Sequence, residues 1–487
     1  MIEAGPYPTA VAREPAASRR GFGALLAVAL SAVGLAALAL AGQVTLLRLA
    51  IPGAAVLVGL VLYFSQPVRY IEYALWLWFL TPLVRRLVDW RFGFAEPNMV
   101  LLAPLLVSGI SALTLVRPNN RTNERPPAAF VLCGAAILYG FAVGMIAHRN
   151  AVSPAEMVYG LANWLCPLLL GLHLYLNWQS YEAHRRSITR TFLCGVLFLG
   201  AYGVYQFFVP APWDLYWLQR VVDLDPLGAT FGKPEPFLIR VWSTLNSPGP
   251  FANVMIAGLL LLFGIRSRWK IPAAIVGYLS LLLSMVRTAW LSWFVGFVLI
   301  LAKTKSRTLV RTLLSVIVIA LCLLPFLADP RVAPLVKDRM QTFADLGHDD
   351  SFGSRADMYG ELIGQSIENP AGFGLSNQTV WQNTPIDSGI ISMLFSLGWL
   401  GTLLFAAGVA SIFLALRNCP GTDPFMVAGR AIATAIFVQI VGGNTFIGIN
   451  AVIFWMFVGM NLSGNRVYET ENARNLMPCA NEELSVA

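Results

Sequence analysis

Long apolar runs separated by short polar segments make up most of the chain. A bilayer core about 30 Å thick requires roughly 20 helical residues, and runs of about 16–22 apolar residues therefore predict about fourteen membrane spans. The third, ninth and tenth runs are short enough to be tilted, half-inserted or fused, so the expected count is about 12–14. The expected spans lie at 21–41, 46–65, 69–84, 98–116, 127–147, 155–178, 189–209, 248–265, 271–286, 288–303, 308–327, 386–416, 425–442 and 445–462.

Two long polar stretches interrupt this pattern in the second half of the chain. Irregular backbone cannot face lipid in a bilayer core, so each stretch must lie in water or against protein. The expected organisation is a tail (1–20), N-terminal spans (21–209), a loop (210–249), central spans (250–327), a larger loop with short helices (328–385), C-terminal spans (386–462) and a second, polar tail (463–487).

Composition agrees with a membrane protein. Hydrophobic residues make up 57% and charged residues 12% of the 487 residues, whereas a soluble domain has about 25% charged residues. The expected fold is therefore an all-α, polytopic transmembrane helical bundle. The net charge of +8 is weak evidence for nucleic acid, because basic residues at helix ends orient membrane proteins in any case, and we expect no nucleic-acid partner.

Basic residues also predict the orientation of the bundle. They concentrate at 117–125, 184–186, 266–270 and 303–307, which all fall on one side of the expected spans. The positive-inside rule places this side, and both termini, in the cytoplasm, and it places the two long loops outside. The first apolar run, 21–41, is longer than the 7–15 residues typical of a signal peptide, so we expect an uncleaved span.

Several common kinds of site leave no signal in the sequence. The six cysteines avoid the expected outer loops, which argues against an extracytoplasmic disulfide framework. The four histidines are scattered without metal-ligand spacing. Asp223-Leu224-Asp225 resembles a metal-binding DxD motif, but this tripeptide is common. The chain has neither a P-loop nor a dinucleotide-binding fingerprint. We therefore predict no metal and no cofactor.

Arginines are frequent on the predicted outer side, where the positive-inside rule expects few. They include Arg86, Arg240, Arg287 and Arg355. Arginine binds phosphate in a bidentate manner, and phosphate beside a membrane means lipid headgroups or a lipid-linked pyrophosphate. The alternative is that each side chain snorkels to the interface or pairs with a nearby acid such as Asp89.

Two of these arginines occupy informative positions. Arg287 separates two short apolar runs, which places it at a hairpin tip or inside a bent helix. An ionisable residue at such a depth indicates either a functional site or a structural ion pair. Arg240 precedes the stretch TLNSPGPFAN, whose prolines and polar residues mark the start of a helix. The helix start explains the prolines but not the arginine.

The larger loop is expected to contain a helix at 354–368. Helical spacing places Arg355, Met358, Tyr359, Leu362 and Ser366 on one packing face. The following Asn-Pro ends this helix, and the glycines at 372 and 374 predict a tight turn leading toward the membrane.

A candidate general base stands where the chain returns to the membrane. Asp387 opens the span at 386–416. An aspartate before an apolar run is commonly a helix N-cap, but a carboxylate at the membrane boundary beside arginines is also able to act as a general base. His348 is the alternative base in the same loop.

Four segments together resemble the bacterial O-antigen ligase and polymerase family of membrane glycosyltransferases. They are Arg240 with STLNSPGPFAN, RTAWL at 287–291, SRADMY followed by ENPAGFGLSN, and DSGIISMLFSLGWLGTLL. Their order and spacing cover mainly residues 190–420. The arginine-rich RRLVDWR is similar to some exopolysaccharide members of the family.

The resemblance implies a fold like that of the C-type membrane glycosyltransferases, in the bacterial inner membrane, with a periplasmic active site. Family members transfer a glycan from undecaprenyl pyrophosphate to a sugar hydroxyl without a metal or a nucleotide sugar. By this resemblance Arg86, Arg240, Arg287 and Arg355 would hold the pyrophosphate, while Asp387 is the candidate base by its position where the chain returns to the membrane. Polysaccharide export or chain-length proteins are the implied partners.

The sequence departs from the ligases of this family at one position. Ligases carry a histidine where the chain returns to the membrane, whereas residues 386–389 read Ile-Asp-Ser-Gly. The departure favours a polymerase of exopolysaccharide or O-antigen repeats. A ligase, a flippase for lipid-linked glycans and a structural subunit of an export complex remain the alternatives.

Overall fold

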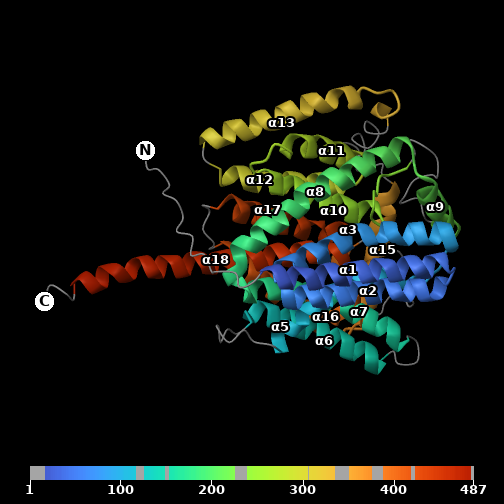
Figure 1. Cartoon of the computed structure of the whole chain (residues 1–487), viewed down its shortest axis with the longest axis horizontal. Coiled ribbons are helices and arrows are strands. Elements are labelled where there is room, and N and C mark those ends of the chain that lie inside the picture. The colour runs from blue at the N-terminus through green and yellow to red at the C-terminus, as the bar shows by residue number, and fades with distance from the viewer. Residues whose placement is uncertain are drawn as a thin grey trace.

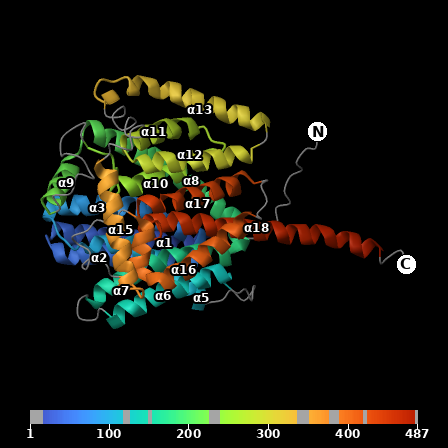
Figure 2. The ribbon, with the colours of Figure 1, turned by 180° about the vertical axis from the view of Figure 1, so that it is seen from behind.

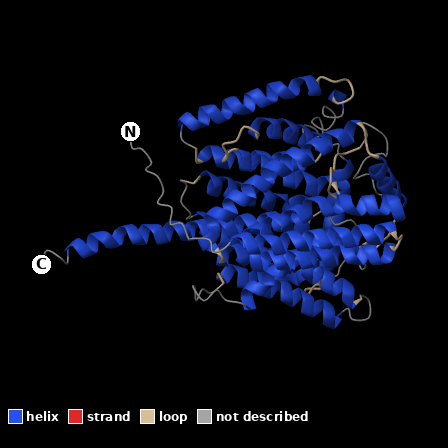
Figure 3. Cartoon of the chain, in the orientation of Figure 1, coloured by secondary structure: helices blue, strands red, loops and turns tan. Residues whose placement is uncertain are grey.

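A computed structural model describes residues 17–116, 126–147, 153–224, 239–304, 306–334, 350–375, 388–417 and 423–483. Helices account for nearly all of this part of the chain, and no strand element occurs in it (Figure 3). The prediction of an all-α bundle is therefore confirmed. The α-helices are α1 (Ala17–Leu40), α2 (Val44–Ser65), α3 (Pro67–Phe92), α4 (Leu102–Gly109), α5 (Leu113–Val116), α6 (Ala128–Ala147), α7 (Pro154–Leu176), α8 (Tyr181–Phe208), α9 (Pro212–Leu224), α10 (Pro248–Leu262), α11 (Lys270–Leu283), α12 (Arg287–Ala302), α13 (Ser306–Leu327), α15 (Asp350–Glu368), α16 (Gly389–Arg417), α17 (Pro424–Val438) and α18 (Gly448–Glu483).

The helices are long and apolar enough for a multi-pass membrane protein. Seven helical stretches of the described chain meet the length and hydropathy of a membrane span, and five shorter apolar helices accompany them. The shorter group includes α11 and α12, with 14 and 16 residues, where the sequence predicted two short runs. One predicted span, 69–84, is longer than expected, because α3 continues to Phe92.

Most helices run along one common axis (Figure 1). One end of the bundle carries α9 and α15 (Figure 2). From the opposite end α18 projects as a single helix toward the C-terminus (Figure 1). The sequence predicted only a polar tail after residue 462, whereas α18 continues to Glu483. Hydrogen bonds between side chains and backbone one turn apart, such as Thr470 Oγ1 to Arg466 O at 2.8 Å, accompany the polar part of this helix.

Close helix contacts build the core of the bundle. A Cβ atom added at Gly171 of α7 would lie 2.4 Å from the carbonyl oxygen of Trp455 in α18. A Cβ atom added at Gly459 of α18 would lie 2.2 Å from the carbonyl oxygen of Gly171. Small residues at such crossings allow helix backbones to approach, which is typical of membrane bundles. By contrast, α13 lies at the edge of the bundle (Figures 1 and 2) and exposes a row of apolar side chains suited to lipid, including Leu321, which is 57% exposed.

The end of the larger loop inserts into a break in α16. Gly398 has φ 65° and ψ −179°, a conformation essentially reserved for glycine, and it interrupts the helix. The break frees two backbone groups, and both find partners in the loop. The amide of Phe373 donates to Phe395 O at 2.7 Å, and the amide of Trp399 donates to Pro370 O at 2.9 Å. The irregular backbone at this break is therefore satisfied within the protein.

The sequence correctly predicted the elements around this insertion. The expected helix at 354–368 lies within α15, and its stripe packs as predicted where side chains are described, since Leu362 and Ser366 are 2% and 1% exposed. Gly372 and Gly374 adopt positive φ angles of 82° and 88°. Seen from behind, α15 crosses the other helices at a steep angle (Figure 2).

Candidate functional site

Arg240 and Arg287, which lie far apart in the sequence, meet at one turn. The Arg240 guanidinium donates to the carbonyl oxygens of Ser284 and Met285, at 3.3 and 3.2 Å. This turn contains a positive φ of 55° at Met285 and leads directly to Arg287, the first residue of α12. Arg287 therefore stands at a hairpin tip between α11 and α12, one of the two positions that the sequence allowed. Both arginine side chains are half-buried.

The start of α16 lies close to this turn. The 3₁₀ segment Gln439–Gly442 separates the two, and a Cβ atom at Gly442 would lie 3.2 Å from the Thr288 side chain. On its other side, a Cβ atom at Gly389 would lie 2.4 Å from Gly443 O. The first turns of α12 and α16 thus pack against the same short segment.

The structure describes no side-chain position for the three remaining candidates. Asp387 and His348 lie outside the described residues, although Asp387 comes two residues before the first residue of α16. Arg355 lies in α15, and its side chain is also outside the described part. Their roles remain predictions.

Arg86 has contacts that differ from the predicted ones. Its side chain is 0% exposed, and Nη1 donates to Asp214 Oδ1 at 2.6 Å. Nη2 donates to the backbone oxygen of Ser243 at 2.7 Å. The groups observed around Arg86 are therefore a buried carboxylate and a backbone carbonyl, which favours a structural ion pair over a phosphate-binding role. Asp214 belongs to the predicted outer loop, which forms α9 in this region.

A buried polar network extends from this ion pair. The Tyr202 hydroxyl and Gln206 Nε2 both donate to Asp214 Oδ2 at 2.8 Å. Gln206 Oε1 accepts from the amides of Trp242 and Ser243, at 3.2 and 2.8 Å. The network therefore fixes the backbone directly after Arg240. The segment 239–245 is buried against the core, although the sequence predicted it as part of a loop.

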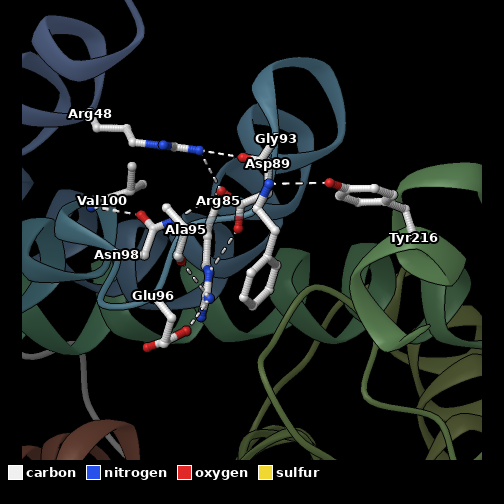
Figure 4. A network of polar contacts seen from close by, with 10 residues as sticks. Arg48, Arg85, Asp89, Gly93, Ala95, Glu96, Asn98, Val100 and Tyr216 are labelled. Carbon is white, nitrogen blue, oxygen red and sulfur yellow. Dashed lines mark hydrogen bonds and ion pairs between the residues drawn. The ribbon is translucent and has the colours of Figure 1, made fainter. Parts of the chain in front are cut away.

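A second network accounts for Arg85 at the same end of α3 (Figure 4). Arg85 donates to Asp89 at 3.2 Å and to Glu96 at 2.6 Å. Asp89 also accepts from Arg48 at 3.1 Å and from Asn98 at 2.9 Å. Pairing with a nearby acid, the alternative weighed for the arginines, is therefore observed for Arg85.

A cavity of about 380 Å³ opens between α7, the inserted end of the larger loop, α16 and the start of α18. Its polar lining includes Asn163, Ser392, Asn444 and Asn450. The described residues around it include no lysine or arginine, and Glu156 is the one charged side chain among them. The segment Gln439–Asn450 lies between this cavity and the turn from Ser284 to Arg287, which is called the arginine turn. A Cβ atom at Gly442 would lie 3.2 Å from Thr288 of α12, and Asn444 lines the cavity.

The arrangement provides two chemically different regions. At the turn, the Arg240 guanidinium lies just before α12, whose first residue is Arg287 and whose first amides carry partial positive charge. Anions commonly bind at such helix N-termini. The cavity instead offers amides and hydroxyls, which bind uncharged polar groups. Among the described residues, no group of three or more His, Cys, Asp or Glu side chains is placed to hold a metal ion.

One protein-family model matches the part of the chain that contains Arg287. Residues 272–406 match the family model described as O-Antigen ligase. The match runs from α11 through the break in α16 and includes Arg287 and the loop predicted to carry the base. The match supports the resemblance of the chain to the O-antigen ligase and polymerase family, whose members are membrane glycosyltransferases of that type. A search of curated proteins gave no match.

Sequence reasoning missed the asparagines of the cavity. Asn253 lies within the apolar run of α10, Asn444 precedes α18, and Asn450 lies in the first turn of α18. Polar side chains inside spans are uncommon and tend to be functional. A polar side chain within an apolar run is visible in the sequence for asparagine as well as for arginine. Considering only ionisable residues leaves the asparagines out.

Proposed function

We propose that the protein polymerises oligosaccharide repeat units linked to undecaprenyl pyrophosphate at the periplasmic face of the inner membrane. The missing histidine at residues 386–389 supports a polymerase over a ligase. The observation that carries the proposal is the meeting of Arg240 and Arg287 at one turn, within or beside the segment that matches the O-antigen ligase family.

The reaction would exchange one bond for another. The acceptor hydroxyl oxygen bonds to the anomeric carbon of the donor glycan, and the bond from that carbon to the pyrophosphate oxygen breaks. Undecaprenyl pyrophosphate leaves with the electron pair, and the acceptor proton passes to a base. Charge develops on the leaving pyrophosphate, and guanidinium groups held in place before the reaction would stabilise it.

Asp387 is the proposed base, with His348 as the alternative. The support for Asp387 is its position in the chain, two residues before the first turn of α16, which packs beside the arginine turn. Arg355 of α15 is proposed to contribute to pyrophosphate binding. We assign Arg86 to holding the site rather than to the substrate, because its guanidinium is paired with Asp214.

The test uses purified protein in lipid nanodiscs with lipid-linked repeat units, and products are resolved as a ladder. Wild-type protein should give a ladder without added metal or nucleotide. Removing a general base typically lowers rates about 10²–10⁴-fold, so Asp387→Asn should give little polymer while remaining folded. Near-normal ladders from Asp387→Asn would return that residue to helix capping, because Asn caps about as well as Asp. In that case His348 would be the proposed general base.

A flippase is the second candidate, since a bundle of this size also suits transport. Vesicles that contain the protein and labelled lipid-linked glycan distinguish the two. Translocation of intact glycan without any ladder would support the flippase and contradict the polymerase.

A further inference from the structure

Amide side chains of α7, of the segment before α18 and of α18 itself line the 380 Å³ cavity. Asn253 of α10 donates to Asn450 Oδ1 at 3.1 Å, and Asn444 Nδ2 donates to Ser392 Oγ at 3.1 Å. Asn450, Asn444 and Ser392 line the cavity, so Asn253 lies directly behind its wall. A volume of this size falls within the roughly 300–1,000 Å³ range of small-molecule pockets.

Several buried polar atoms in α10 and in the segment 439–445 lack a protein hydrogen-bond partner. They are Asn253 Oδ1, Thr445 Oγ1 and Gln439 Nε2. Their residues are only 5%, 1% and 6% exposed, respectively. A buried polar atom without a partner costs about 1–3 kcal/mol, so an apolar residue at such a position would be more stable unless a bound hydroxyl or water completes the bonding. These three residues lie outside the cavity lining, whose own asparagines and serines offer the donors and acceptors suited to a ligand rich in hydroxyl groups.

We propose that this cavity binds the uncharged terminal sugar of the acceptor glycan, an inference that rests on the proposed glycosyl transfer. Amides donate and accept at once, as sugar hydroxyls do. The cavity lining carries Glu156 and no described cation, which disfavours an anionic ligand. The donor pyrophosphate belongs instead at the arginine turn. The segment Gln439–Asn444 lies between the two regions and would set the acceptor hydroxyl beside the donor's anomeric carbon.

The first test separates binding of the acceptor from a purely structural role. Asn253→Leu removes an unsatisfied buried oxygen and also the hydrogen bond to Asn450, so the two effects oppose each other and the melting midpoint should change little. In the ladder assay, the same variant should raise at least fivefold the concentration of lipid-linked repeat unit needed for half-maximal rate. Its affinity for undecaprenyl pyrophosphate alone should stay within twofold of wild type. A wild-type ladder from Asn253→Leu would overturn the positioning role of this residue.

The second test does not require catalysis. Ser392→Cys, introduced into a cysteine-free background, places a thiol at the cavity, and a methanethiosulfonate reagent reports its accessibility. The oligosaccharide released by mild acid from the lipid-linked repeat units should slow labelling at least fivefold, whereas inorganic pyrophosphate should not. The matched control is Ser411→Cys, which lines a separate cavity of about 320 Å³ between α6, α7, α16 and α18. Its labelling rate should not change.

The outcomes distinguish this inference from the proposed function. Protection at Ser392→Cys without any ladder from wild-type protein would support the sugar site and contradict the polymerase. A ladder without protection would support the polymerase and overturn the cavity assignment. Protection by pyrophosphate, or equal protection at Ser411→Cys, would also overturn it.

Discussion

The buried ion pair of Arg86 and Asp214 gives a quantitative test of how the site is held. Both side chains are at most 1% exposed, and their charged atoms lie 2.6 Å apart. Removing one partner leaves the other charge buried and uncompensated, which costs about 3–5 kcal/mol. With an unfolding entropy of about 2.1 cal/mol/K per residue, a chain of 487 residues changes its melting midpoint by about 1 °C per kcal/mol. Arg86→Met and Asp214→Leu should therefore each melt about 3–5 °C below wild type.

The double variant distinguishes an ion pair from two independent residues. With both charges removed, no uncompensated charge remains, so Arg86→Met/Asp214→Leu should melt above either single variant. Intrinsic tryptophan fluorescence of detergent-purified protein measures the midpoint, since the chain has 14 tryptophans. Single variants with the wild-type midpoint, or strictly additive losses, would refute this reasoning. A stable Arg86→Met that loses only activity would instead assign Arg86 to the substrate.

An exposed pair supplies the control. Arg331 donates to both carboxylate oxygens of Asp329, at 2.9 and 2.8 Å. These hydrogen bonds lower the pKa of Asp329 to about 2, so the pair is ionised at neutral pH. It lies just beyond the end of α13 and is open to solvent, where ion pairs contribute little. Arg331→Gln should therefore leave the melting midpoint unchanged.

Three further predictions follow from the geometry. Arg287→Lys should lower the ladder yield at least tenfold with normal folding, because a point charge does not reproduce the guanidinium fork, while Arg331→Lys should have no effect; equal yields from both would remove Arg287 from the site. Gly398→Ala should lower the melting midpoint, because its Cβ atom would lie 2.3 Å from Ala371 O at a positive φ; an unchanged midpoint would contradict the docked loop. A cysteine at Asp223 or at Asp345 should react with an impermeant maleimide in intact cells, and labelling of either one only after permeabilisation would reverse the predicted topology.

Hydropathy predicted most of the helices because lipid requires every span to be apolar and internally hydrogen-bonded. It failed where charges are buried within the protein. The helix α3 passes its predicted end because Arg86 finds Asp214, 128 residues away in the sequence. Hydropathy also could not show that α16 breaks at Gly398, which alone among the glycines of α16 adopts a positive φ.

The candidate site was predictable only in part. The sequence marks Arg240 and Arg287 because charged residues at span ends on the outer side are unusual. Their meeting depends on a hydrogen-bonded turn at Ser284 and Met285, which no local pattern specifies. The cavity likewise depends on the packing of α7, α16 and α18, so its asparagines gain meaning only in the folded chain.

The most direct test of the central claim is the stoichiometry of the reaction. Purified protein in nanodiscs is incubated with lipid-linked repeat units, and mass spectrometry quantifies both the new glycosidic bonds and the free undecaprenyl pyrophosphate. Glycan transfer at the site of Arg240 and Arg287 predicts one undecaprenyl pyrophosphate released per bond formed, with both products falling together in Arg287→Lys. Bond formation without release of undecaprenyl pyrophosphate, or release without bond formation, would contradict the account.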